Sequence, residues 1–123
     1  MAKDIDIVKR TFDFAVNIIG FAEKLSENHG TDKIIAQQVL RCGTSVGANV
    51  EEAQAGESRA DFIHKLKIAL KEARETNYWL RLISQAKIVS EKDVDFFIKE
   101  SDEILRVISQ IIINSQKNSK SVE

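Results

Sequence analysis

The sequence predicts an all-α protein, a single domain folded as an antiparallel up-down-up-down four-helix bundle. The 123 residues contain no proline, and charged and apolar residues make up 30% and 43% of them, a balance typical of water-soluble helical domains. Apolar residues recur at the helical period in four long segments. The breaks between these segments are short, so consecutive helices must fold back on each other.

The first boundary is the turn sequence Asn28-His29-Gly30. Glycine suits the left-handed backbone position just after a helix, and Thr31 is a residue type that caps the start of the next helix. The second segment ends at Gly56, again a residue that helices favour at their carboxyl end. These punctuating residues separate the first three segments without needing a long loop.

Two capping patterns mark the later helix starts. Ser58 with Asp61 three residues on is an acidic variant of the capping box, and Ser90 with Asp93 repeats it. The expected helices are residues 4–27, 32–55, 59–87 and 91–115, inside a bundle of residues 1–116. The polar tail 117–123 is expected to be disordered.

The first helix carries two apolar stripes, about 110° apart at ~100° per residue. One consists of Ile5, Val8, Phe12, Ala15, Ile19 and Ala22, and the other of Ile7, Phe14, Ile18, Phe21 and Leu25. Together they exceed what one bundle core needs. Either the helix is deeply seated in a monomer, or one stripe faces a neighbouring subunit; we favour the second interpretation.

Gly43 and Gly47 lie on the apolar face of the second helix. A glycine inside a helix costs about 1 kcal/mol relative to alanine, so a close neighbour must compensate. A phosphate-binding loop is excluded because no strand precedes Gly47 and no lysine follows it. A hinge is the weaker alternative. We expect close packing of these glycines against Ala69 and Ala73 of the third helix.

Two polar surfaces are candidates for binding. Arg41, Ser45, Asn49 and Glu52 form a stripe on the second helix, which is either a solvated face with local Arg-to-Glu pairing or a hydrogen-bonding surface for a partner. Lys67, Lys71, Arg74, Tyr78 and Arg81 lie along one flank of the third helix. They form either a solvated face or a surface that follows a phosphate backbone, with the tyrosine stacked on a base.

Most catalytic chemistry is excluded. Two histidines and one Asp-x-x-His spacing, Asp61 with His64, fall short of the ligand set of a di-iron bundle, so neither a metal nor another cofactor is expected. Cys42, the single cysteine, lies on an apolar face and suits inert packing in a reducing cytoplasm. No apolar run approaches the roughly 18 residues of a membrane span.

Arg59 and His64 are the one candidate catalytic pair. Their Arg-x4-His spacing resembles the motif of the HEPN ribonucleases, in which the arginine stabilises phosphate charge and the histidine transfers protons. Ala60 follows the arginine where those enzymes usually have a polar residue, and the motif comes early in this chain. A ribonuclease is therefore the alternative to a non-enzymatic protein.

The most specific resemblance lies between Arg41 and Ile83. Its pieces are TSVGAN, AQAGES, FIHKLKIALKEA and ETNYWL, which together cover about a third of the chain. This run resembles the four-helix-bundle proteins encoded in 23S rRNA intervening sequences. That family is similar to the accessory variability protein of diversity-generating retroelements, which binds nucleic acid and a reverse transcriptase through a basic surface. The resemblance implies a homo-oligomer, a pentamer in relatives, with no known catalytic activity.

The resemblance transfers the basic surface to Lys65, Lys67, Lys71, Arg74 and Arg81. The leading hypothesis is a cytoplasmic, non-enzymatic homo-oligomer that binds RNA, DNA or a nucleic-acid-associated protein. A net charge of −1 argues for a localised site rather than a generally basic protein. A scaffold that binds only protein is a further alternative.

Overall fold

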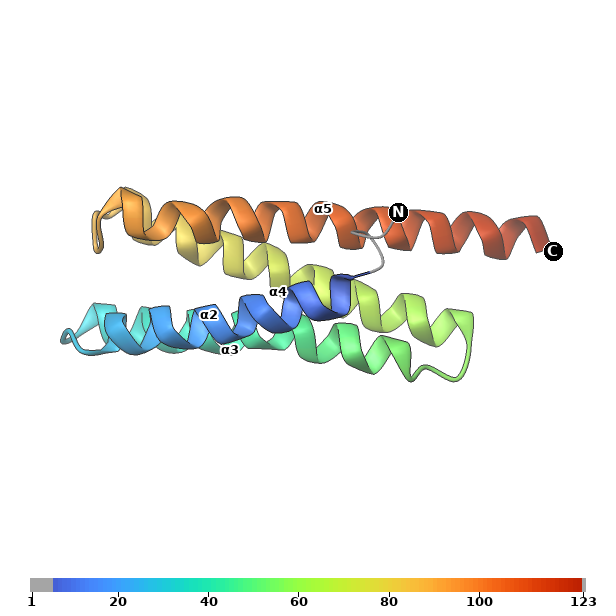
Figure 1. The fold of residues 1–123 in the computed structure, drawn as a ribbon, viewed down its shortest axis with the longest axis horizontal. Coiled ribbons are helices and arrows are strands. Elements are labelled where there is room, and N and C mark those ends of the chain that lie inside the picture. Colours follow the sequence, from blue (N-terminus) through green and yellow to red (C-terminus); the bar gives the residue numbers. More distant parts are fainter. Residues whose placement is uncertain (1–5, 123) are drawn as a thin grey trace.

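The computed structural model describes residues 6–122, which form four helices and contain no strand. The helices are α2 (Ile7–Ser26), α3 (Thr31–Gln54), α4 (Arg59–Gln85) and α5 (Glu91–Val122). Figure 1 shows each helix turning back along the one before it. The all-α, single-domain four-helix fold predicted from the sequence is therefore confirmed. Residues 4 and 5 of the first expected helix lie outside the described residues.

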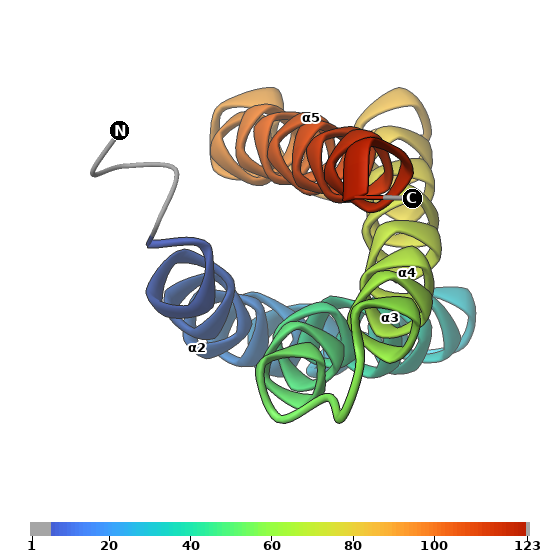
Figure 2. The same ribbon diagram turned by 90° about the vertical axis from the view of Figure 1, so that its right-hand side faces the viewer.

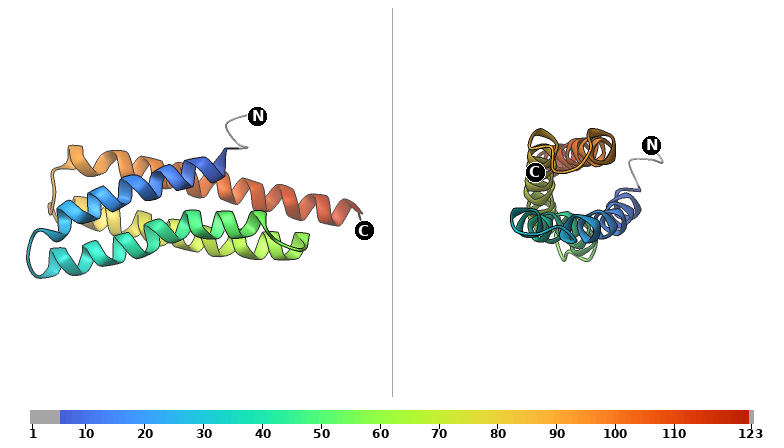
Figure 3. Two further views of the ribbon diagram at one scale, coloured as in Figure 1. Left: turned by 60° about the horizontal axis from the view of Figure 1, so that its bottom comes forward. Right: turned by 90° about the vertical axis from the view of Figure 1, so that its left-hand side faces the viewer.

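The four helices form an open arc rather than a closed square. Seen end-on, α3 and α4 occupy the middle of the arc, and α2 and α5 lie at its two ends (Figures 2 and 3). α2 packs along α3, α3 along α4 and α4 along α5, whereas α2 and α5 touch over a much smaller area. The bundle thus has three closed seams and one that is largely open.

The contacts between α2 and α5 include an aromatic cluster and a set of ion pairs. The ring of Phe97 lies 4.8 Å from the ring of Phe21 and 6.3 Å from that of Phe14. Arg10 donates two hydrogen bonds of 2.8 Å to the carboxylate of Glu100, and a third of 3.1 Å to Glu103. These bonds to Glu100, above all, raise the pKa of Arg10. An aromatic cluster and a bidentate ion pair therefore close part of an otherwise open seam.

The two stripes of α2 have different environments. Ile7, Phe14, Ile18 and Leu25 of one stripe are buried in the core, with Phe21 half-buried beside them. In the other stripe Ala22 is buried, but Phe12 and Ile19 are 57% and 51% exposed. Ile5 lies outside the described residues. The stripe that contains Phe12 and Ile19 therefore points mostly away from the core of its own chain.

Gly43 and Gly47 allow α2, not α4, to approach α3. A Cβ on Gly43 would lie 2.8 Å from Cγ2 of Ile18, and one on Gly47 would lie 3.1 Å from the backbone oxygen of Thr11. The expected pairing of these glycines with Ala69 and Ala73 is wrong, although both alanines are buried. Helical periodicity identifies the apolar face of α3, but it does not say which neighbour lies along which edge of that face.

The beginnings of α3 and α4 follow the turn residues. Ser58 caps α4, since its Oγ accepts a 3.0 Å hydrogen bond from the backbone N–H of Asp61, as the sequence predicts. Gly30 adopts φ +65° and precedes α3 directly. Thr31 is therefore the first residue of α3, and the cap position expected for it belongs to Gly30.

α4 ends two residues before its predicted end, in a turn that the sequence does not announce. Lys87 adopts φ +58°. Its N–H donates to the oxygen of Ser84, and that of Ile88 donates to the oxygen of Ile83, both at 3.1 Å. This pair of bonds is a Schellman motif, which usually has glycine at the left-handed position. Because lysine occupies this position, the sequence has no glycine to mark the end of the helix.

α5 continues to Val122, past its predicted end at 115 and through most of the tail expected to be disordered. Neither proline nor a glycine after Gly56 interrupts this region. Nη1 of Arg59, the first residue of α4, donates a 3.4 Å hydrogen bond to the backbone oxygen of Ser115. The last turns of α5 therefore extend beyond the start of α4 (Figure 1).

Candidate nucleic-acid interface

The outer surface of α4 carries the exposed cations Lys67, Lys71 and Arg74. They recur at spacings of four and three residues, so they lie on one face of the helix. None of the three makes an ion pair or a side-chain hydrogen bond with any residue between 6 and 122. Their charge is therefore directed to solvent rather than neutralised by the fold.

Arg81 and Tyr78 extend this face toward the end of α4. Nε of Arg81 donates a 2.9 Å hydrogen bond to Oδ1 of Asn77. The amide of Asn77 is itself held by α5, because Nδ2 donates to the backbone oxygen of Ile98 at 3.2 Å and to Oγ of Ser101 at 3.0 Å. Asn77 thus orients the guanidinium without removing its charge. Tyr78 is half exposed.

Lys65, the sixth residue of the predicted surface, has a different environment. It is half-buried, and its Nζ lies 4.0 Å from a carboxylate oxygen of Glu52 on α3. Its position on the edge of α4 that faces α3 gives it a partner within the fold. The structure therefore separates Lys65 from Lys67, Lys71, Arg74 and Arg81, which face outward.

The polar stripe of α3 lies at the seam with α4. Arg41 forms ion pairs with Glu75 and, at 3.5 Å, with Glu72, rather than with Glu52 of its own helix. Its hydrogen bond to Glu75 is the main cause of its raised pKa. Nε1 of Trp79 donates to the same Glu75 carboxylate at 3.2 Å. The expected local pairing is replaced by a bridge between two helices.

The bridge between Arg41 and the two glutamates compensates negative charge on α4. Glu72 and Glu75 are the acidic residues beside the basic face, and both are paired with Arg41. The remaining members of the polar stripe bond within the protein, since Nδ2 of Asn49 donates to the backbone oxygen of Ser45 at 2.9 Å. Spacing alone could not reveal this bridge, because its partners come from different helices.

The candidate catalytic pair, Arg59 and His64, lies at the beginning of α4. Arg59 is bonded to Ser115 of α5, while His64 is exposed and lies five residues further along α4. Five residues correspond to about 140° around a helix. The two side chains therefore start from different faces of α4.

Other chemistry-bearing groups lie apart. Cys42 is fully buried, its thiol donates to the backbone oxygen of Val39 at 3.8 Å, and burial raises the pKa of that thiol. Within residues 6–122, no three His, Cys, Asp or Glu residues are grouped to hold a metal ion. No helix in this part of the chain is long and apolar enough to cross a membrane.

The chain matches a known protein family. The model of the 23S rRNA-intervening sequence protein family matches residues 3–110. The chain belongs to this family. The resemblance stated from the TSVGAN, AQAGES and FIHKLKIALKEA segments is therefore confirmed.

A solved structure supports the same assignment. It is a protein of unknown function from the S23 ribosomal protein family of Bacteroides thetaiotaomicron VPI-5482. It shares 38% sequence identity with this chain, covers 86% of it and 97% of its own length, and superposes with a TM-score of 0.80. No curated protein matches the chain.

Proposed function

We propose that the protein is a non-enzymatic homo-oligomer that binds nucleic acid through the basic face of α4, formed by Lys67, Lys71, Arg74, Tyr78 and Arg81. One observation carries this proposal: Lys67, Lys71 and Arg74 are exposed and unmatched by any carboxylate of the described chain. Arg10 and Arg41, by contrast, are bound to glutamates. Unpaired cations in a row attract phosphates and release their counterions.

The dimensions of the basic face suit a nucleic-acid strand. From Lys67 to Arg81 the face extends about 21 Å along α4 at ~1.5 Å per residue. Cations at that spacing can contact several successive phosphates. Tyr78, which is 49% exposed, lies between Arg74 and Arg81 and can stack on a base. We favour nucleic acid over a protein partner because the face combines these cations with an aromatic ring.

The oligomer proposal rests on the outward stripe of α2. Phe12 and Ile19 are more than half exposed, and Leu40 of α3 is exposed beside a depression of about 320 Å³ that Ile19 also lines. Apolar side chains gathered at one surface favour a subunit contact. Family resemblance makes a ring of five the expected assembly. A ring acting in the cytoplasm would carry one basic face on each subunit, and the electrostatic potentials of these faces would add.

The test is a titration of labelled structured RNA at low and moderate salt. The double variant Lys67→Ala/Arg74→Ala is compared with Lys9→Ala/Lys99→Ala, which removes the same charge from residues paired with aspartates. We expect the first variant to weaken binding and to reduce the slope of log K against log salt by about 1.5. The second should change neither appreciably.

Each result separates the alternatives. Equal effects of the two double variants, or no binding by the wild-type protein at micromolar concentration, would contradict the α4 interface and leave the protein-only scaffold. RNA cleavage on a denaturing gel that disappears in His64→Ala would contradict the non-enzymatic proposal. Light scattering then gives the subunit number, and a monomer would overturn the oligomer.

A further inference from the structure

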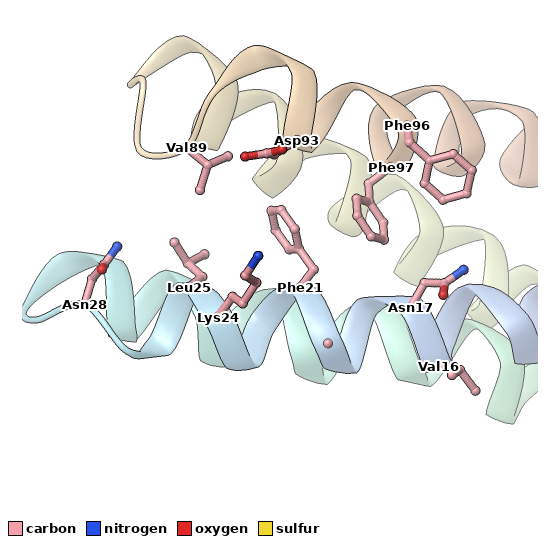
Figure 4. A pocket seen from close by; sticks show the side chains of 11 residues that line it. Val16, Asn17, Phe21, Lys24, Leu25, Asn28, Val89, Asp93, Phe96 and Phe97 are labelled. Atoms are coloured by element: carbon pink, nitrogen blue, oxygen red, sulfur yellow. The ribbon is translucent and has the colours of Figure 1, made fainter.

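A groove of about 600 Å³ lies between α2 and α5, where the fourth seam of the bundle stays open (Figure 4). Its base is formed by Phe21 and Phe97, whose side chains extend toward each other from the two helices. Val16 and Phe96 line it as well, and each is 53% exposed. Exposed apolar side chains beside a cavity of this size are typical of a binding site.

The open space around Gly20 is a second, independent observation that favours a binding site. This glycine lies inside α2, lines the groove, and a Cβ there would meet no atom within 4 Å. Such a glycine costs about 1 kcal/mol relative to alanine. The approach of α2 compensates for Gly43 and Gly47, but nothing in the described chain compensates for Gly20. A missing side chain at this position leaves room for the backbone of a bound molecule.

The charges at the groove provide a third observation. Lys24 projects from α2 and Asp93 from α5, so a cation and an anion stand on opposite sides (Figure 4). Neither forms an ion pair with any residue from 6 to 122. An occupant that carries a carboxylate on one flank and a cation on the other would satisfy both.

We propose that this groove binds an amphipathic helix of another protein. The α2 side of the groove runs from Val16 to Leu25, about 14 Å along the helix axis. A helix laid along it would place apolar residues at positions i, i+4 and i+7 over Phe21 and Phe97. A carboxylate on this helix would face Lys24 and a cation would face Asp93. The bound helix would complete the open seam of the bundle.

A second copy of the chain is a poorer occupant. Among its described residues, the exposed large apolar side chains form one i, i+4, i+7 row, which is Phe12, Val16 and Ile19. This row belongs to α2, and Val16 already lines the groove. The exposed apolar residues of α3, α4 and α5 do not form such a row. The proposal therefore names a different protein, and it is independent of nucleic-acid binding by α4.

The probe is a fluorescein-labelled, alanine-based peptide of about 18 residues, long enough to be helical, with leucines at i, i+4, i+7 and i+11. It carries one glutamate and one lysine on opposite flanks. We expect wild-type protein to bind it, and Gly20→Leu and Phe96→Lys to weaken binding by about tenfold or more. Gly20→Leu has space for its side chain, so it should fold. Ile113→Lys, at an exposed position of α5 outside the groove, is the matched control.

A charge exchange tests the orientation of the helix. Lys24→Glu should weaken binding of the first peptide and strengthen binding of a peptide whose glutamate is replaced by lysine. The proposal is overturned if wild-type protein binds neither peptide, or if it binds a scrambled peptide equally well. It is also overturned if Phe96→Lys, but not Ile113→Lys, reduces the size of the assembly, since the groove would then be a subunit contact.

Discussion

The two long edges of α2 are packed in opposite ways. On one edge α3 approaches so closely that a Cβ would lie 2.8 Å from α2 at Gly43 and 3.1 Å from it at Gly47. On the other edge α5 stands away, Gly20 has open space, and a groove of about 600 Å³ remains. The same residue type thus has two meanings in one bundle. At the α3 edge glycine permits a contact already made, and at the α5 edge it leaves a surface without a partner in this chain.

The two edges of α2 are also held by different kinds of contact. At the α3 edge the contact is between the backbone of Gly47 and the backbone of Thr11, which cannot move away independently. At the α5 edge the contacts are side chains, namely the Phe21–Phe97 ring pair and the Arg10–Glu100 ion pair. We therefore expect substitutions at the α3 edge to lower the free energy of unfolding far more than substitutions at the α5 edge.

The largest expected effect is that of Gly47→Leu. Its side chain would overpack the α2/α3 seam against backbone atoms that begin 3.1 Å from the Cβ position. Overpacking of a core costs about 1–3 kcal/mol and sometimes more, and we expect a loss of at least about 3 kcal/mol in the free energy of unfolding. Chemical denaturation measures this loss. Gly20→Leu is the control, and an unchanged stability of Gly47→Leu would contradict the close packing.

A smaller loss is expected for Arg10→Ala. Glu100, whose side chain is only 21% exposed beside Arg10, would lose its bidentate partner. Removing one member of a partly buried pair should cost about 1–2 kcal/mol, less than for a fully buried pair because solvent screens it. Denaturation at low and high salt measures it. Lys9→Ala, which breaks an exposed pair with Asp13, should lower the free energy of unfolding much less; equal losses would show that the α5 edge does not depend on Arg10.

The smallest expected effect is a gain in stability rather than a loss. Gly20→Ala should raise the free energy of unfolding by up to about 1 kcal/mol, because alanine favours the helix and its Cβ meets no atom within 4 Å. Gly43→Ala should lower stability, because its Cβ would lie 2.8 Å from Ile18. Thermal melts of the two variants compare the edges directly. A melting temperature that falls for Gly20→Ala would mean that the α5 edge is closed in solution.

Local signals account for most of what could be predicted. Ser58 caps α4 because its hydroxyl needs only a backbone N–H three residues away. The basic face of α4 follows from helical spacing, which places Lys67, Lys71 and Arg74 together without information from other helices. Lys87 shows the limit of such signals, since its left-handed backbone is held by hydrogen bonds rather than by its residue type.

The sequence by itself determined four helices, their apolar faces and the row of cations on α4, because each depends on periodicity within one segment. Only the tertiary structure decided that Gly47 meets α2, that Arg41 neutralises Glu75, and that α2 and α5 leave a groove. These features depend on how helices lie beside each other. Periodicity specifies which face of a helix is buried, but the neighbour at each edge is chosen by packing among all four helices.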